Sequence, residues 1–293
     1  QKKVTKETSA AKAPVATVDT TSSPLKNNQN TLKATQALLD HIKQQRSQAS
    51  TQPGAKKNLL AGDDEQDVLG AEKEAIYVVF TTKKFLTDRK NLKPKRIAIP
   101  HPIYNAKDTS ICLFSKDPQR AYKDALLTGQ GENKDEPAHA SLTRVIGVSK
   151  LKGKFKSFEA RRALMGQHDI FIAEDNVVTT LPRLLGKTFY ESGKIPLSVN
   201  LESRDAISAV KAKSEIIKIL NSTLFTVAPG TYSAIKIGYT TDAFSAKDLV
   251  ANLEAVAEYF SEKVVSNGWN GIRGVHIKTA SSTSLPIWAT ESL

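Results

Sequence analysis

The segment HDIFIAEDNVVTTLPRLLGKTFYESGKIPLSVN, residues 168–200, decides the fold class that we predict for this chain. It begins with an apolar run at residues 170–173 that is too short for a helix and is closed by an acidic pair, so we predict a buried strand. A helical pattern from Val177 follows, and Gly186 is a typical helix stop. We expect a polar loop next, and then a strand over residues 195–199. The segment therefore predicts the second half of an α/β unit and the exit from it.

The residues before this segment alternate between strand and helix patterns, which is typical of a parallel sheet. The predicted strands cover 110–114, 144–148 and 170–173, and the predicted helices cover 118–127 and 151–166. We therefore predict an α/β domain of three layers over residues 104–194.

The sequence patterns on either side of this α/β domain predict a second group of helices and strands. The expected helices cover 31–47, 207–220 and 246–265, and the expected strands cover 75–81, 97–100, 224–227, 233–239 and 274–279. The strands at 75–81 and 97–100 are separated by a long basic loop, and we expect them to pair. We therefore predict a discontinuous α+β domain built from residues 31–103 and 195–293, to which the chain returns at residue 195.

The formal net charge of +12 is concentrated in two segments. Residues 83–96 contain seven basic residues and one acidic residue, a net charge of +6, and residues 150–162 contain six and one, a net charge of +5. A localised excess of this kind is expected for a protein that binds a polyanion. A solvated loop and an ordinary charged surface helix are the alternative interpretations. Residues 1–30 have no apolar periodicity, and we expect a disordered basic tail there.

The sequence contains no convincing catalytic or metal-binding constellation. The five histidines are scattered, and none lies at ligand spacing from another histidine, cysteine or carboxylate. Glu174-Asp175 ends a predicted strand, where α/β enzymes place active groups, but an acidic helix N-terminus is the ordinary explanation. Gly129-Gln130-Gly131 follows a helix pattern instead of joining a strand to a helix, which excludes a phosphate loop. We therefore expect no enzyme activity, no cofactor, no metal and no small-molecule substrate.

The single cysteine, Cys112, lies in an apolar strand pattern and is expected to be a small buried hydrophobe. One cysteine excludes a disulfide framework and favours a reducing compartment. No apolar run approaches the roughly 18 residues of a membrane span, and no signal peptide is visible. We expect no membrane partner.

Four short stretches resemble the ribosomal protein L1 family. Residues 185–187, LGK, stand where the family has LGP, and residues 193–196, GKIP, stand where it has RGKMP. Residues 99–102, IPHP, are similar to the family's LPHG at the crossing into its inserted domain. Residues 278–286, KTASSTSLP, occupy the place of its KSTMGP loop, with Ser-Leu in place of Met-Gly. The resemblance covers roughly residues 32–287 and implies the L1-like fold: a discontinuous α+β sandwich domain with an inserted Rossmann-like α/β domain.

The resemblance also implies non-catalytic RNA binding. Residues 188–191 depart from the ribosomal protein and are similar to eukaryotic nucleolar relatives, which are ribosome assembly factors. Residues 117–123 and 150–162 most resemble the member found in the large-subunit precursor (pre-60S) near internal transcribed spacer 2. The alternatives are the related small-subunit processome (90S) component and a protein-interaction adaptor with incidental RNA affinity. The implied partners are pre-rRNA and other assembly factors of a pre-ribosomal particle in the nucleolus.

The expected contacts come from the two basic segments and from the residues 278–286. The implied RNA-binding residues are Lys83, Lys84, Arg89, Lys90, Lys93, Lys95, Arg96, Lys278, Ser281, Ser282, Thr283 and Ser284. A second contact to RNA or protein is expected from Lys150, Lys152, Lys154, Lys156, Arg161, Lys187 and Lys194.

Overall fold

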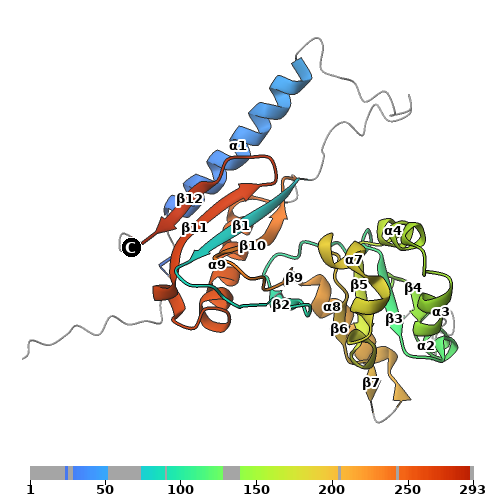
Figure 1. Ribbon diagram of the computed structural model, residues 1–293. Helices are drawn as coiled ribbons and strands as arrows, with labels where there is room; N and C mark the ends of the chain where they lie inside the picture. Colours follow the sequence, from blue (N-terminus) through green and yellow to red (C-terminus); the bar gives the residue numbers. More distant parts are fainter. Residues whose placement is uncertain are drawn as a thin grey trace, which may run out of the picture.

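The computed structural model has two layered parts (Figure 1). It describes residues 24–25, 29–51, 74–89, 91–127, 139–203, 206–241 and 244–290. Lys90, the loop at residues 129–131 and most of the predicted tail over residues 1–30 lie outside the described residues. Within the stretch predicted as tail, Leu25 is fully buried in the core of the first part.

The first part is an antiparallel sheet of four strands with two helices on one face. In spatial order the strands are β10 (Tyr232–Tyr239), β1 (Ala75–Thr82), β11 (Ile272–Thr279) and β12 (Leu285–Ala289), and the helices are α1 (Gln29–Thr51) and α9 (Ala246–Lys263). Alternate residues of β1 (Ile76, Val78 and Phe80) point into the core beneath the helices. There the rings of Phe80 and Phe260 stack with their centroids 4.2 Å apart. The opposite face of the sheet carries no described helix.

The second part is a parallel sheet between two helical layers. In spatial order its strands are β4 (Leu142–Gly147), β3 (Ile111–Ser115), β5 (Ile170–Glu174) and β6 (Leu197–Val199). One face packs against α2 (Gln119–Leu126) and α8 (Ala209–Leu220), and the other against α3 (Val148–Gly153), α4 (Phe158–Gln167), α5 (Asp175–Val178), α6 (Leu181–Leu185) and α7 (Lys187–Glu191). Because both faces are covered, β3 and β5 are buried at every position. The parallel sheet predicted from the sequence is therefore confirmed.

Short elements complete the fold. A two-stranded antiparallel sheet of β2 (Lys95–Ala98) and β9 (Ser222–Phe225) lies between the two parts (Figure 1). The strand expected at 97–100 therefore pairs with β9 and not with β1. The remaining elements are β7 (Glu202–Ser203), β8 (Ala206–Ile207) and the 3₁₀ helix η2 (Gly268–Gly271).

The predicted return to the first part at residue 195 is wrong. The strand expected over residues 195–199 is β6, which pairs in parallel with β5, and Ile216 and Ile219 of α8 pack into the same core. The chain crosses back at Asn221, where α8 ends and β9 begins. The second part therefore extends well beyond residue 194. An apolar pattern predicts a strand, but the backbone partners available in the folded chain decide which sheet that strand joins.

Two local predictions are also corrected. The polar loop expected after Gly186 is helix α7, in which Phe189 is fully buried and its ring lies edge-on to Phe171 at 4.9 Å. The helix expected over residues 151–166 is broken into α3 and α4, and the Ser157 hydroxyl accepts a hydrogen bond from the N–H of the third residue of the new N-terminus. Gly186 does end a helix, as predicted, with φ of 64°.

Candidate nucleic-acid interface

The basic loop, residues 83–96, is held by backbone hydrogen bonds to the start of β10 and β11. Thr82 N donates to Thr231 O at 2.8 Å, Lys83 N donates to Gly271 O at 2.9 Å, and Asn91 N donates to Val227 O at 3.0 Å. These bonds attach the beginning of the loop and Asn91 to neighbouring segments. The described residues beside them therefore present their side chains from an anchored backbone.

Four cations of the basic loop are exposed: Lys83, Lys84, Arg89 and Lys93. None of them has a carboxylate partner among the described residues. Lys95 is half-buried at the start of β2. Unpaired exposed cations of this kind suit contacts to phosphate, because each contact releases counterions from the nucleic acid.

Arg96 differs from these four because it is already paired. Its Nη1 lies 2.9 Å from Glu215 Oε2 on α8, and Lys218 Nζ lies 2.9 Å from Glu215 Oε1. Burial opposes ionisation of Glu215, but the hydrogen bonds from Lys218 and Arg96 hold the pKa of its carboxyl below the ordinary value. Arg96 thus links the basic loop to the second part of the fold, and its RNA contact stays a prediction.

The serine and threonine loop, residues 280–284, forms hydrogen bonds with the residues next to it. Ser281 Oγ donates to Glu74 Oε1 at 2.6 Å, and Ser281 N donates to the same oxygen at 3.1 Å. Ser282 Oγ accepts from Thr279 N at 2.9 Å. The Glu74 carboxylate places negative charge beside the loop, which disfavours a phosphate at Ser281. The exposed hydroxyls of Thr283 and Ser284 are better placed for an external contact.

The structure does not bring the basic loop and the serine and threonine loop together. Ile76 pairs with Thr279 at one end of β1, and Thr82 pairs with Ile272 at the other. The two loops therefore lie at opposite ends of a strand of 8 residues, which spans about 25 Å. Any single RNA that reaches both must follow the length of the sheet.

The open face of the first sheet joins these two ends, and it was not predicted from the sequence. Tyr77 of β1 lies opposite Lys236 of β10 on one side and Lys278 of β11 on the other. All three residues are half-buried. They form a cation–aromatic–cation row across three strands. The alternation of Tyr77 and Thr81 with the buried Ile76, Val78 and Phe80 was the signal that could have located this face, although Val79 on the same face is buried as well.

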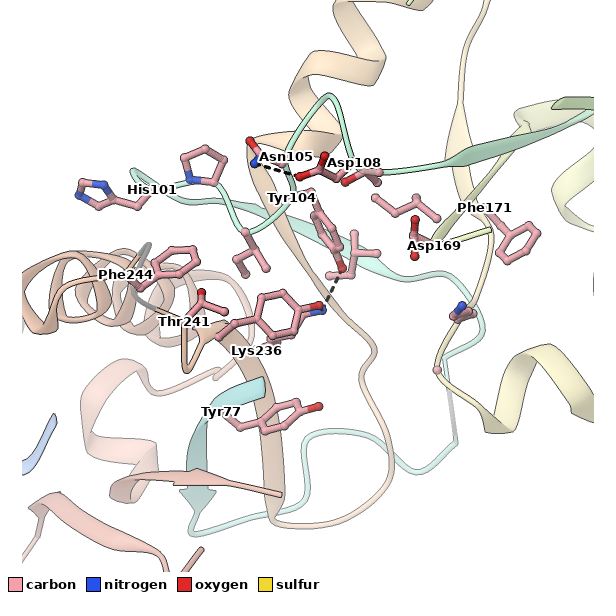
Figure 2. A pocket seen from close by; sticks show the side chains of 18 of the residues that line it. Tyr77, His101, Tyr104, Asn105, Asp108, Asp169, Phe171, Lys236, Thr241 and Phe244 are labelled. Carbon is pink, nitrogen blue, oxygen red and sulfur yellow. Dashed lines mark hydrogen bonds between the residues drawn. The ribbon is translucent and has the colours of Figure 1, made fainter. Parts of the chain in front are cut away.

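A cleft of ≈ 800 Å³ lies between the two parts, beside this row (Figure 2). Lys236 Nζ donates to Tyr104 OH at 3.1 Å and to Tyr239 OH at 3.0 Å, and it lies 4.8 Å from the centroid of each ring. Burial opposes its charge, but the two phenol groups raise the pKa of Lys236 overall. Asp108 and Asp169 face the cleft from the second part. The cleft is therefore mixed in charge, unlike the basic loop.

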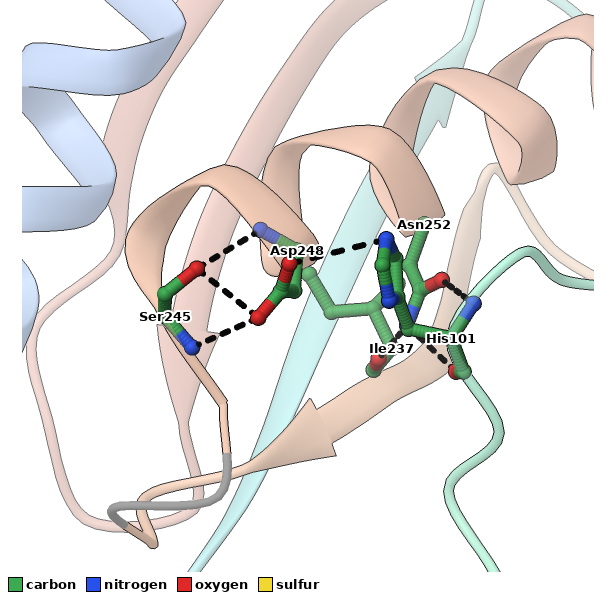
Figure 3. A network of polar contacts seen from close by, with 5 residues as sticks. All are labelled: His101, Ile237, Ser245, Asp248 and Asn252. Atoms are coloured by element: carbon green, nitrogen blue, oxygen red, sulfur yellow. Dashed lines mark hydrogen bonds and ion pairs between the residues drawn. The ribbon is translucent and has the colours of Figure 1, made fainter.

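The segment that crosses into the second part is clamped by one buried amide (Figure 3). Asn252 of α9 accepts a hydrogen bond from His101 N and donates to His101 O, each at 2.9 Å, and it also donates to Ile237 O at 2.9 Å. The neighbouring Asp248 forms a capping box with Ser245 and lies 3.5 Å from His101 Nε2. These contacts fix the crossing segment against α9 and β10.

The second basic segment, residues 150–162, is divided between surface and structural roles. Lys150, Lys152, Lys154 and Lys156 are exposed on α3 and the turn that follows it. Arg161 instead donates from Nε to Phe155 O at 3.0 Å and from Nη2 to Lys156 O at 2.9 Å. Its guanidinium therefore holds the turn between α3 and α4, and its role as a contact residue stays a prediction.

Two lysines after Gly186, both predicted as contact residues, differ in their surroundings. Lys187 is exposed at the start of α7. Lys194 Nζ donates to Met165 O at 3.0 Å and to His168 O at 2.8 Å, where the carbonyls at the end of α4 lack helical partners. Lys194 therefore caps a helix, and its contact to RNA or protein stays a prediction.

The acidic pair at the end of β5 has a structural explanation. Glu174 is buried and accepts hydrogen bonds from Lys116 N at 3.1 Å and Tyr122 OH at 2.8 Å. Asp175 lies in the first turn of α5. The described residues contain no group of three or more histidine, cysteine or carboxylate side chains that could hold a metal ion. Over the same residues, no helix has the length and apolar character that crossing a membrane requires.

Comparisons with known proteins are consistent with one family. A model of the family described as ribosomal protein L1p/L10e matches residues 38–283. A ribosome biogenesis protein of Schizosaccharomyces pombe is 35% identical over 261 residues, which cover 89% of this chain and 65% of that protein. Ribosome biogenesis protein UTP30 of Saccharomyces cerevisiae is 24% identical over 80% of this chain and 88% of its own length.

A further Saccharomyces cerevisiae relative, proteasome-interacting protein CIC1, is 25% identical over 76% of this chain and 59% of its own length. The chain therefore spans less than two thirds of the Schizosaccharomyces pombe protein and of CIC1.

Proposed function

This chain belongs to the ribosomal protein L1p/L10e family, and from this premise we propose that it is a non-catalytic ribosome assembly factor that binds ribosomal RNA. Relatives at 35% and 24% identity are named ribosome biogenesis proteins, which supports a role in ribosome assembly. The fold is that of ribosomal protein L1, of mixed α/β content with a parallel sheet, and we propose that this sheet belongs to an inserted Rossmann-like domain. We propose that it acts in a pre-ribosomal particle, in the nucleus at the nucleolus.

The observation that carries RNA binding is the group of exposed cations in the basic loop, at one end of β1. Toward the other end of β1, Tyr77 and Lys278 lie opposite each other on the same sheet. Lysines supply phosphate contacts, and an aromatic ring beside them offers a base a stacking surface. The exposed lysines of residues 150–156 provide a second contact to RNA or to a neighbouring protein.

Within the assembly role, we propose the large-subunit precursor as the particle and internal transcribed spacer 2 as the nearby RNA. The similarity of residues 117–123 and 150–162 to the large-subunit member supports this choice. Depletion should then accumulate intermediates that still carry spacer 2, while early small-subunit cleavages proceed normally. Northern blots with probes on either side of spacer 2 test this. Accumulated small-subunit precursor with timely removal of spacer 2 would move the assignment to the processome relative.

A protein-interaction adaptor is the second candidate, and the name of one relative, proteasome-interacting protein CIC1, favours it. Ultraviolet crosslinking of the purified chain to transcribed pre-rRNA separates the two candidates. An RNA-binding assembly factor should crosslink at preferred peptides of the basic loop and the open sheet face. An adaptor should crosslink weakly and without preferred peptides.

A further inference from the structure

Two aromatic side chains are exposed to solvent at the end of the first sheet where β1 leads into the basic loop. Phe85 is 72% exposed and Tyr232 is 71% exposed. They come from different segments, the basic loop and the first position of β10. Rings of this size are normally packed, so their exposure contributes little to the stability of the fold.

The backbone places the segments that carry the two rings side by side. Tyr232 pairs with Thr81, the residue before the end of β1. Beyond that pair, Thr82 N donates to Thr231 O at 2.8 Å and Leu86 N donates to Gly230 O at 3.5 Å. The stretch that contains Phe85 is thus attached at both sides to the residues just before Tyr232.

The same backbone contacts fix the segments that carry the two rings. Gly230 has φ of 135°, a conformation that side chains rarely allow, and this shapes the turn before Tyr232. Leu86 packs its side chain against the core of the first part while Phe85 points away from it. The Thr82 hydroxyl closes the bend by donating to Lys84 O at 2.7 Å. The rings are therefore presented by an ordered backbone.

The charges around the rings are those of a nucleic-acid surface. Lys83 and Lys84 immediately precede Phe85, and Arg273 is exposed at the start of β11, on the other side of β1. Protein interfaces enrich aromatic residues and arginine but are depleted of lysine. Surfaces for unpaired nucleic acid combine lysine-rich tracks for the backbone with rings on which successive bases stack. The adjacent lysines therefore favour RNA over a protein partner.

We propose that Phe85 and Tyr232 form a stacking platform for unpaired nucleotides of the bound RNA, with Lys83 and Lys84 holding the adjacent phosphates. This inference rests on the proposed RNA-binding function and adds the kind of RNA that this end of the sheet takes: a single-stranded segment, whose bases are free to stack. A duplex presents its bases edge-on in the grooves and cannot use the rings in this way.

Fluorescence anisotropy with a labelled oligouridine, which has no duplex structure, and with a labelled RNA hairpin of similar charge, closed by a tight tetraloop whose bases stack on its own stem, tests the platform. Replacing both rings, Phe85→Ser with Tyr232→Ser, should weaken oligouridine binding about tenfold or more, from the loss of base stacking. Hairpin affinity should change less than about twofold, and the salt dependence should stay the same because no charge is removed. The thermal midpoint should hardly move, because both rings are exposed.

Matched variants keep the rings. Phe85→Tyr and Tyr232→Phe should bind oligouridine as the unmodified chain does. Phe85→Trp adds a fluorophore to the two native tryptophans, and oligouridine should quench the added emission. A quench without any loss of affinity in the double serine variant would count against stacking as a source of binding.

The contrary results separate the two proposals. If the double serine variant binds oligouridine as tightly as the unmodified chain, the platform is wrong and the rings face a protein neighbour. If it loses oligouridine and hairpin equally, the rings shape the loop instead of stacking with bases. Binding of pre-rRNA but not of oligouridine by the unmodified chain overturns the platform alone. A chain that binds no RNA overturns the proposed function as well.

Discussion

The two basic segments are nearly equal in sequence but different in the fold. Residues 83–96 carry a net charge of +6 and residues 150–162 carry +5. The first segment is a loop with exposed cations and an exposed ring, and its backbone is bonded to Gly230 before β10, Gly271 before β11 and Val227 after β9. The second is a broken pair of helices in which Arg161 holds the turn. Charge density therefore indicates a surface, and only the backbone shows which cations are available to a ligand.

The largest expected difference between the segments is in RNA affinity. Replacing Lys83, Lys84 and Lys93 by glutamine should lower the slope of log affinity against log salt for pre-rRNA by about 2, at roughly 0.7 to 0.9 per lost phosphate contact. The matched set Lys150→Gln, Lys152→Gln and Lys154→Gln removes the same charge and should change the slope by less than about 1. Filter binding over a salt series measures both. If both triple variants change the salt slope equally, the two segments contribute equally to RNA binding.

The next effect is on stability, and it separates neighbours within the second segment. Arg161→Gln should lower the free energy of unfolding by about 1–3 kcal/mol, because two backbone carbonyls lose a charged donor. Arg162→Gln, at the exposed neighbouring position, should stay within about 0.5 kcal/mol. Urea unfolding measures the difference. If the two variants are indistinguishable, the turn between α3 and α4 does not depend on Arg161.

A smaller effect distinguishes two arginines of the basic loop. Arg96→Gln breaks the ion pair with the partly buried Glu215 and should cost up to about 1 kcal/mol of stability, since Arg96 itself is partly exposed. Its effect on the salt slope for RNA should be near zero. Arg89→Gln should show the reverse pattern, with a lower salt slope and unchanged stability. If Arg96→Gln lowers the salt slope, Arg96 contacts the RNA backbone as well as Glu215.

The smallest expected effect is the pH dependence of this link. Since the folded pKa of Glu215 lies below its ordinary value, its contribution to stability is present above the unfolded pKa and is lost as pH falls through the folded pKa. The stability difference between the unmodified chain and Glu215→Gln should therefore shrink on acidification from pH 7 to about 3. Urea unfolding at several pH values measures it. A difference that grows on acidification would reverse the assigned direction.

Much of the fold follows from sequence periodicity. The alternation of apolar runs predicted the parallel sheet, because β3 and β5 are buried on both faces and leave unbroken apolar signals. The long helices α1 and α9 were also predicted. The break between α3 and α4 was missed, because the basic residues between Leu151 and Phe158 fit a helix pattern that the hydrogen bonds of Arg161 interrupt.

The candidate site was only partly predictable. The exposed lysines of the basic loop and of residues 150–156 lie on the surface, as their charge indicated. The sequence could not show that Arg96, Arg161 and Lys194 are engaged by Glu215 and by backbone carbonyls. Nor could it align Tyr77 with Lys236 and Lys278, because strand register is a relation between segments more than 150 residues apart.

The sequence by itself determined the secondary structure periods, the parallel sheet and the location of the excess charge, because these depend on residues close together in the chain. The tertiary structure decided which sheet β6 joins, how far apart the basic loop and residues 280–284 lie, and which cations face water. These features depend on pairing between distant segments. A lysine has the same charge whether it caps α4 or stands in solvent, and only the folded backbone distinguishes Lys194 from Lys83.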